Sequence, residues 1–196
     1  QGFTIEGGFD LISELMNDFP QLKEGSTEIF LMIYANIVFT YGLRRFVEQA
    51  HAVGLRGLIV PDMPFDSDEG LKDIADEYGL RIIPVVSSNT RQDRIRKIQN
   101  MKTEYIYCAL RTGITGARTE LGEEHTAFLD RVASGGAKIL AGFGVVDREQ
   151  VLALADHVHA VVAGSVFFRA KPEEGDEKHC EAVIRSLVRA FLGHNT

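Results

Sequence analysis

Cysteine and long apolar runs are scarce in this sequence, and each absence excludes a class of protein. Two cysteines, Cys108 and Cys180, are too few for a disulfide framework in a chain of 196 residues. The longest apolar runs, such as 58–60 and 160–163, are far shorter than the roughly 20 residues that cross a bilayer. Residues 1–6 show no basic region followed by an apolar one, so no secretory signal is visible. We therefore expect a cytoplasmic protein with no membrane-spanning segment.

Basic charge is also in short supply. The chain has 21 Lys and Arg against 28 Asp and Glu, a net charge of -7. Because nucleic-acid binding depends on basic side chains that neutralise phosphates, we expect no nucleic-acid partner. A phosphate group bound here must then be held by local geometry. With 45% hydrophobic residues the chain can bury one substantial core, and we expect a single domain over residues 1–196.

What the sequence does contain is a repeated alternation of apolar strand patterns and amphipathic helix patterns. A helix is predicted first, over Phe9–Phe19, and it ends at Pro20. Six strand-then-helix units follow: Ile29–Tyr34 with Leu43–Val53, Gly57–Val60 with Ser67–Tyr78, Arg81–Val86 with Arg91–Met101, Tyr105–Leu110 with Glu123–Ala133, Lys138–Gly142 with Arg148–Ala155, and Ala160–Ala163 with Lys178–Leu192.

This alternation predicts parallel strands covered by crossover helices, in an α/β fold. A doubly wound nucleotide-binding sheet would have a Gly-rich turn after its first strand, and none follows Tyr34. The Gly-rich strand ends come late instead, where barrel enzymes hold phosphate. We therefore predict a TIM (β/α)8-type barrel with six strand-helix units here, two fewer than the usual eight, so that the barrel is incomplete at its N-terminal side.

Three late segments could bind phosphate: 111–118, Ala141–Gly144 and Ala163–Ser165. Each presents backbone N–H groups without an obstructing Cβ at the face where barrel loops meet. A phosphate dianion can accept hydrogen bonds from such groups, and a short helix beginning at Ser165 would add the positive end of its dipole. Turn-forming glycines are common, but three such segments in consecutive units favour a phosphate site.

The same segments carry a family resemblance. In order and spacing, the motifs of this chain resemble those of the tryptophan synthase alpha chain from Thr4 to the C-terminus. The motifs are Leu31-Met-Ile-Tyr-Ala-Asn36 with Tyr41-Gly42, Val60-Pro-Asp-Met-Pro64, Arg111-Thr-Gly-Ile-Thr-Gly-Ala-Arg118, Gly142-Phe-Gly144 and Gly164-Ser165.

The resemblance implies a lyase that cleaves indole-3-glycerol phosphate to indole and glyceraldehyde 3-phosphate by a retro-aldol route in tryptophan biosynthesis. It also implies a tryptophan synthase beta chain as partner, which would carry pyridoxal phosphate, while this chain holds no cofactor and no metal. By the same resemblance the phosphate lies on Gly116, Gly144, Gly164 and Ser165. The remaining substrate contacts are Thr115, Phe143 and the indole-pocket residues Met32, Tyr34, Ile59 and Tyr107, of which Tyr107 is also a possible auxiliary catalytic residue.

The family also needs a general acid/base glutamate on the second barrel strand and an aspartate in the following loop, and neither motif occurs in these 196 residues. We therefore expect this chain, as given, to be inactive as a lyase and to associate with itself through the incomplete barrel. Two other readings stay open: a barrel that binds a phosphorylated ligand or the beta chain without catalysis, and another phosphosugar-processing TIM barrel. The Thr-Gly-Ala-Arg ending of 111–118 argues against the second.

The remaining polar candidates have structural interpretations. Asp62 could be a catalytic carboxylate after a strand, but Pro61 and Pro64 favour a turn. His157 and His159 lack the accompanying ligands of a metal site. The acidic run 66–69 suits a helix start. Finally, segment 113–121 is expected to be mobile without ligand, because loops that close over substrates have low local stability.

Overall fold

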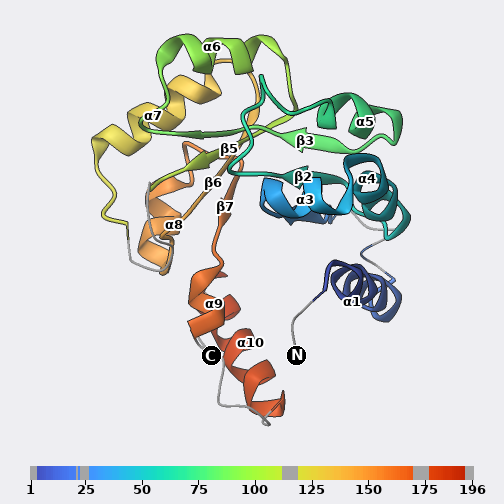
Figure 1. The fold of residues 1–196 in the computed structure, drawn as a ribbon. Helices are drawn as coiled ribbons and strands as arrows, with labels where there is room; N and C mark the ends of the chain where they lie inside the picture. The colour runs from blue at the N-terminus through green and yellow to red at the C-terminus, as the bar shows by residue number, and fades with distance from the viewer. Residues whose placement is uncertain (1–3, 21, 23–26, 112–118, 170–176, 193–196) are drawn as a thin grey trace. The chain divides into compact units, whose positions relative to one another are not determined.

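The computed structural model describes residues 4–20, 22, 27–111, 119–169 and 177–192. The chain forms two compact units, Gln1–Val85 (unit 1) and Val86–Thr196 (unit 2), each with its own parallel sheet (Figure 1). The expectation of a single domain over residues 1–196 stays a prediction.

Unit 1 is built on a three-stranded parallel sheet. Its strands β1 (Phe30–Met32), β2 (Gly57–Ile59) and β3 (Arg81–Ile83) lie in that order. The register pairs Met32 with Ile59, and Ile59 with Ile83. A crossover helix must separate parallel neighbours, and the chain supplies two helices between β1 and β2, namely α3 (Ala35–Tyr41) and α4 (Leu43–Ala52). A third, α5 (Leu71–Glu77), joins β2 to β3.

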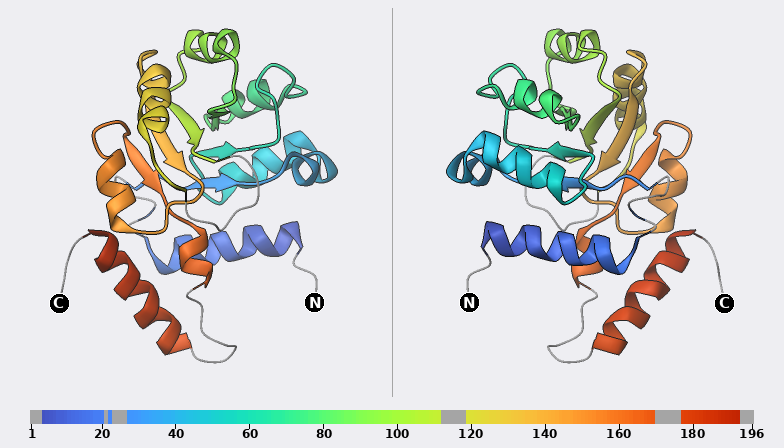
Figure 2. Two further views of the ribbon diagram at one scale, coloured as in Figure 1. Left: turned by 90° about the vertical axis from the view of Figure 1, so that its left-hand side faces the viewer. Right: turned by 90° about the vertical axis from the view of Figure 1, so that its right-hand side faces the viewer.

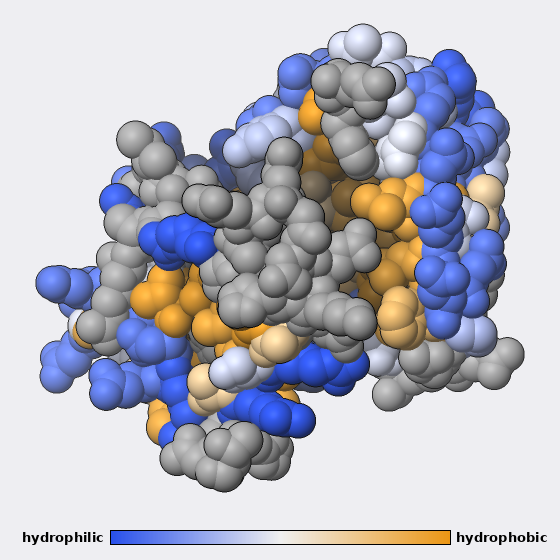
Figure 3. All heavy atoms as spheres, turned by 90° about the horizontal axis from the view of Figure 1, so that it is seen from below, coloured by the Kyte–Doolittle hydropathy of each residue, from blue (hydrophilic) through white to orange (hydrophobic). Residues whose placement is uncertain are grey.

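Helix α1 (Ile5–Asp18) precedes this sheet, and Figure 2 shows it running below β1. Thr4 caps its N-terminus, because the Thr4 hydroxyl accepts a hydrogen bond from Gly7 N at 3.1 Å. One face of the helix packs inward through buried Phe9 and Met16. Large apolar side chains are exposed on α1 and just after it, namely Leu11, Leu15 and Phe19. In the view from below in Figure 3, hydrophobic residues reach the surface beside hydrophilic ones.

The core of unit 1 is organised around an aromatic group. Phe46, which is fully buried, lies 5.1 Å from the Phe9 ring and 6.0 Å from the Tyr41 ring between centroids. Tilted and edge-on arrangements at these separations are favourable for aromatic pairs. Beside this group lies an apolar pocket of about 210 Å³. Its lining comes from α1, β1, α3 and α4, as follows: Thr4, Ile5, Gly8, Phe9, Ile12, Leu31, Ile33, Ile37 and Phe46.

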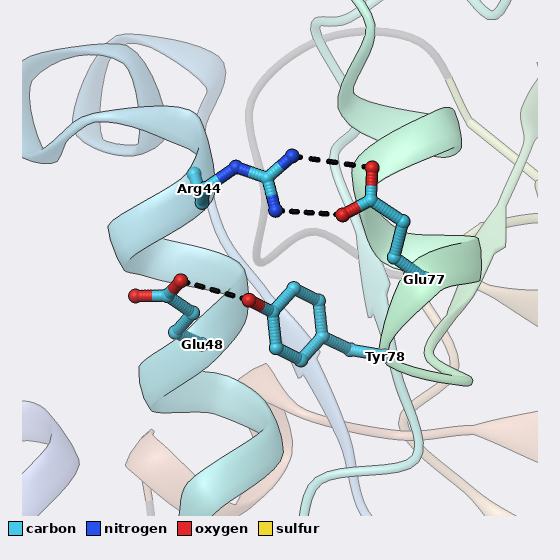
Figure 4. Close-up of polar contacts among 4 residues, drawn as sticks. All are labelled: Arg44, Glu48, Glu77 and Tyr78. Atoms are coloured by element: carbon cyan, nitrogen blue, oxygen red, sulfur yellow. Dashed lines mark hydrogen bonds and ion pairs between the residues drawn. The ribbon is translucent and has the colours of Figure 1, made fainter.

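Polar contacts join the outer surfaces of α4 and α5. The Arg44 guanidinium donates two hydrogen bonds to the Glu77 carboxylate, at 2.6 and 3.1 Å, and the Tyr78 hydroxyl donates one to Glu48 at 2.8 Å (Figure 4). The bond from Arg44 lowers the pKa of the Glu77 carboxyl and, reciprocally, raises that of the guanidinium. These side chains are about half exposed, so solvent screens the pair.

The sheet of unit 2 has longer strands. In spatial order it contains β4 (Val85–Ser87), which begins at the last residue of unit 1, then β5 (Tyr105–Ala109), β6 (Lys138–Gly142) and β7 (Ala160–Val162). All five residues of β5 are buried. Strand β6 is parallel to both β5 and β7, and Gly142 is paired with Ala109 on one side and Val162 on the other. The three strands therefore end at the same edge of the sheet.

The helices of unit 2 follow the strands in turn. They are α6 (Gln92–Asn100), α7 (Glu123–Ala133), α8 (Arg148–Leu154), α9 (Ser165–Arg169) and α10 (Glu177–Leu192), and α10 contacts α8. Gln99 of α6 fixes the end of α7, because its amide donates to the carbonyl oxygens of Arg131 and Val132 at 2.9 and 3.0 Å. In the described part of the chain, no helix is both long and apolar enough to span a membrane.

Three elements differ from the sequence prediction. Helix α3 was not predicted. The strand predicted over Arg81–Val86 is two strands, β3 and β4, separated by Pro84, whose missing N–H interrupts a ladder. The helix predicted from Ser67 begins only at Leu71, with Gly70 at its N-cap. The Asp68 carboxylate accepts hydrogen bonds from Gly70 N and Lys72 N, so Asp68 has a structural role at this helix start.

Candidate functional site

The candidate residues of unit 1 lie at and beyond the end of β1. Met32, the last residue of β1, stands beside Ile59 in the parallel register, so their side chains share one face of the sheet. Ile59 is buried, whereas Met32 is 39% exposed and Tyr34, at the N-cap of α3, is 60% exposed. Unit 1 therefore presents an apolar and aromatic surface there, of the kind that stacks against a flat ring.

Asp62 has a structural role in the same unit. Its Oδ1 accepts a hydrogen bond at 2.9 Å from Ala35 N, the first amide of α3. This bond joins the segment after β2 to the segment after β1, and it satisfies one of the amides that a helix start leaves without an intrahelical partner. The structural interpretation of Asp62 agrees with this contact.

The candidate residues of unit 2 meet around Tyr107, in the middle of β5. Tyr107 is 2% exposed, and its ring lies 5.4 Å from that of Phe143 in an edge-on arrangement. Burial raises the pKa of the Tyr107 hydroxyl above its ordinary value, so the hydroxyl stays protonated at neutral pH. Gly142 has no side chain where the Tyr107 ring passes, and a Cβ at this position would overlap the Tyr107 hydroxyl. Tyr107 and Phe143, both predicted as substrate contacts, are thus in contact with each other, and their role toward a substrate stays a prediction.

Directly after β6 the backbone takes an unusual path. Phe143 has φ of 70° and Gly144 has φ of 88°, so two successive residues are left-handed. Glycine adopts this conformation readily, but phenylalanine does so only at a cost and where its surroundings hold it. Gly164 follows β7 in the same way that Gly144 follows β6, since Val162 is the register partner of Gly142. Both glycines therefore belong to the same sheet edge.

Space around Gly164 is open. A Cβ built there meets no atom within 4 Å, and Ser165 begins α9 immediately afterwards. The Ser165 hydroxyl accepts a hydrogen bond from the Arg169 guanidinium at 3.4 Å. The other two loop candidates, Thr115 and Gly116, lie outside the described residues.

Sequence reasoning missed Thr119 and Gln150, which are buried polar residues with 6% and 3% exposure. The Gln150 amide donates to Thr119 O at 2.6 Å and Gly144 O at 3.1 Å, and its oxygen accepts from Val146 N at 2.8 Å. Thr119 also donates from its N to Gly144 O and from its hydroxyl to Phe143 O. Of the segment 113–121, which is expected to be mobile without ligand, residues 113–118 lie outside the described residues, and the mobility stays a prediction. No local pattern marks a glutamine as buried, so no feature of the sequence indicates this network.

Other titratable candidates have ordinary surroundings. The His157 ring contacts the Asp130 carboxylate at 2.7 Å, and the His159 ring lies 6.0 Å from that of Tyr105. Among the described residues, no group of three or more His, Cys, Asp and Glu side chains could hold a metal ion. Cys108 is a free, buried thiol, and burial raises its pKa to about 12.

Comparisons with known proteins place these features in a family. A family model described as "Tryptophan synthase alpha chain" matches residues 1–191. The tryptophan synthase alpha chain of Helicobacter hepaticus is 36% identical over 170 residues, which cover 86% of this chain and 64% of that protein. That of Methanosarcina acetivorans is 36% identical over 196 residues, covering 99% of this chain and 69% of that protein. This chain thus spans about two thirds of the length of these relatives.

Solved structures give the same result. The tryptophan synthase complex of Pyrococcus furiosus matches with a TM-score of 0.80 at 28% identity, over 98% of this chain and 74% of that one. A structure described as the basis of mutual activation of the a2b2 complex from the same organism matches with a TM-score of 0.81 at 30% identity, over 98% and 75%. These matches confirm the α/β, TIM-barrel class of fold that the strand-helix repeat predicted. The chain belongs to the tryptophan synthase alpha chain family.

Proposed function

We propose that this chain carries the phosphate and indole recognition of an indole-3-glycerol phosphate lyase in tryptophan biosynthesis. The reaction is the retro-aldol cleavage that releases indole and glyceraldehyde 3-phosphate. The observation that carries the proposal is the common edge of β6 and β7, where Gly144 and Gly164 follow the paired residues Gly142 and Val162. Backbone N–H groups free of a Cβ at such an edge suit a phosphate group.

The proposal assigns a part of the substrate to each group of candidate residues. Gly144, Gly164 and Ser165 of unit 2, together with Gly116, take the phosphate. Phe143 lies next in sequence to Gly144, and its ring packs edge-on against Tyr107, so we assign it to the glycerol phosphate and Tyr107 to the indole. As further substrate contacts we propose Met32, Tyr34 and Ile59 for the indole ring, and Thr115.

A beta chain is the proposed partner. The a2b2 assembly named for the Pyrococcus furiosus structure supports this pairing. Pyridoxal phosphate would then reside on the beta chain, and this chain would need no cofactor. The free thiol of Cys108 is consistent with a reducing compartment, so we place the protein in the cytoplasm.

The phosphate site is tested by comparing two left-handed glycines. Gly144 has φ of 88° and Gly136, just after α7, has φ of 89°, so Gly144→Ala and Gly136→Ala impose the same kind of backbone strain. Calorimetric titration with glycerol 3-phosphate should give a dissociation constant at least about tenfold weaker for Gly144→Ala, which corresponds to one lost hydrogen bond to a charged group. Gly136→Ala should bind as the unsubstituted chain does. Equal affinities in both variants would contradict the site.

The chemistry of these 196 residues alone is a separate proposal. We propose that the family's two catalytic carboxylates are not among them, and general acid-base groups contribute about 10² to 10⁴ each in rate. We propose that a polypeptide of these residues binds the substrate without releasing indole, even when a beta chain is added. Indole release that is abolished by Asp62→Asn would overturn this, and would make Asp62 catalytic in spite of its bond to Ala35 N.

A further inference from the structure

Gln150 and Thr119 form a buried hydrogen-bond network with the Phe143–Gly144 turn. We infer that Gln150 and Thr119 are positioning residues that aim the backbone N–H groups of Gly144 and Val145 toward the bound phosphate. This inference rests on the proposed function, because it concerns the same phosphate site.

The Gln150 side chain forms three hydrogen bonds to backbone groups, two of them in the turn after β6 and one at Thr119. The side chain comes from α8, and both its amide nitrogen and its amide oxygen contact the turn after β6. Its Nε2 donates to Thr119 O and to Gly144 O, while its Oε1 accepts from Val146 N. Its own backbone N is bonded to the Asp147 carboxylate at 2.9 Å, which fixes the start of α8. An amide group is the one side-chain group that can both donate twice and accept in this way.

Thr119 completes the arrangement from the other side. Its hydroxyl donates to Phe143 O at 3.1 Å, and its N donates to Gly144 O at 3.0 Å. Thr119 is itself held through its carbonyl oxygen by Gln150. The two residues therefore fix both successive carbonyl groups of the left-handed turn.

The fixed carbonyl groups determine where the amides point. The described peptide bonds are trans, and in a trans peptide the C=O and the following N–H point in opposite directions. Because Phe143 O faces Thr119, Gly144 N–H points away from Thr119. Because Gly144 O faces both Thr119 and Gln150, Val145 N–H points away from both. Two consecutive amides are thus directed to the side opposite the network.

The strained backbone needs this support. Phenylalanine at φ of 70° is disfavoured by the contact of its Cβ with the backbone, and a turn held by weaker contacts would relax. Relaxation would rotate the peptide planes and redirect the amides. Gln150 is only 3% exposed and Thr119 only 6% exposed, so water cannot readily replace their hydrogen bonds. Directed amides are what an anion requires from a backbone site.

The test exchanges the donor for an acceptor. In Gln150→Glu, the introduced carboxylate would face Thr119 O and Gly144 O, which it repels, so the turn should relax. The matched control is Gln99→Glu, since Gln99 also donates to two carbonyl oxygens in unit 2, at the end of α7. At pH 8 the dissociation constant for glycerol 3-phosphate should be roughly tenfold weaker in Gln150→Glu and unchanged in Gln99→Glu.

A pH series separates positioning from loss of structure. Burial beside carbonyl oxygens raises the pKa of an introduced carboxyl, and its neutral form can donate a hydrogen bond again. The affinity ratio of Gln150→Glu to the unsubstituted chain at the same pH should therefore approach one as the pH falls from 8 to about 5.5. The ratio for Gln99→Glu should stay at one. A ratio that is one at every pH, or equally reduced at every pH, would overturn the inference.

Two further measurements test the inference if the Gln150→Glu variant does not fold or if the unsubstituted chain does not bind the ligand. If Gln150→Glu does not fold by circular dichroism, Thr119→Val and Thr119→Ser replace it: the inference requires weaker binding in the first and retained binding in the second. If the unsubstituted chain binds no glycerol 3-phosphate, the proposed function fails. The positioning is then judged by amide NMR resonances, which must shift at Gly144 and Val145 in Gln150→Glu but not in Gln99→Glu. Unshifted resonances would overturn the inference independently.

Discussion

Unit 1 holds its candidate residues through side-chain packing, whereas unit 2 holds them through hydrogen bonds to backbone carbonyls. Met32 and Ile59 stand on strands three residues long, and their neighbours Leu31 and Leu58 pack in the core that contains Phe46. In unit 2, β6 runs for five residues into a turn that Thr119 and Gln150 fix through its carbonyl oxygens. Substitutions that change side-chain volume should therefore lower the free energy of unfolding most in the core of unit 1. In unit 2, substitutions at the crowded end of β6 should test how closely the side chains pack there.

The largest loss of stability is expected from Phe46→Ala. The substitution empties the centre of the aromatic group in unit 1, where Phe46 is fully buried, and such changes cost about 3–5 kcal/mol. Urea unfolding followed by circular dichroism would measure the loss. Phe39→Ala is the control, because Phe39 is 43% exposed on the neighbouring helix α3. Similar losses for the two variants would contradict the packing account of unit 1.

A smaller loss is expected from Gly142→Ala in unit 2. The new Cβ would overlap the Tyr107 hydroxyl and lie 3.0 Å from the Val162 Cβ, and overpacking of this kind costs ~1–3 kcal/mol. Tyr107→Phe in the same chain removes the overlapping oxygen, so the double variant should recover part of the loss.

The same unfolding experiment supplies the control for Gly142. Gly164→Ala places a Cβ where no atom lies within 4 Å, and it should leave the free energy of unfolding almost unchanged. If Tyr107→Phe and Gly142→Ala were additive, the hydroxyl would not be what limits the space.

The smallest effect is expected at the surface of unit 1, from Arg44→Ala. The pair with Glu77 is about half exposed, so salt and water screen it. Since the pKa of the Glu77 carboxyl is lowered in the folded chain, any stabilisation is present above the carboxyl's ordinary pKa and is lost as the pH falls through the lowered value. A double-mutant cycle of Arg44→Ala and Glu77→Ala, at low and high salt, would measure the coupling. A coupling that persists in high salt would show that packing, not charge, joins α4 to α5.

The sequence could predict the elements that have a regular local pattern, but not those that depend on contacts between distant residues. Helix α7 and strand β6 have the predicted bounds, 123–133 and 138–142, because the pattern of each is regular and glycines at 135 and 136 separate them. Helix α3 was missed because its residues are apolar on both faces and follow a strand directly. Its first amide is held by Asp62, 27 residues away, and no local pattern reveals such a bond.

The candidate site divides in the same way. Glycine-rich strand ends are visible in the sequence, and the structure places Gly144 and Gly164 after paired strands as that pattern predicted. Gln150 was not predictable, because a buried polar residue inside a helix pattern looks like a solvent-facing one until its partners are known, and Thr119 stands in a segment without a regular pattern. The left-handed Phe143 likewise depends on those partners rather than on its own preference.

The thiol of Cys108 can report how often the sheet of unit 2 opens transiently to solvent. The thiol is fully enclosed in β5, and with its pKa raised to about 12 it remains protonated at neutral pH, so a soluble alkylating reagent can react only when the strand is transiently exposed. The rate at which the peptide containing Cys108 gains mass in iodoacetamide therefore measures how often the centre of this sheet opens. A ligand bound at the edge of β6 should stabilise the sheet and so slow the alkylation of Cys108.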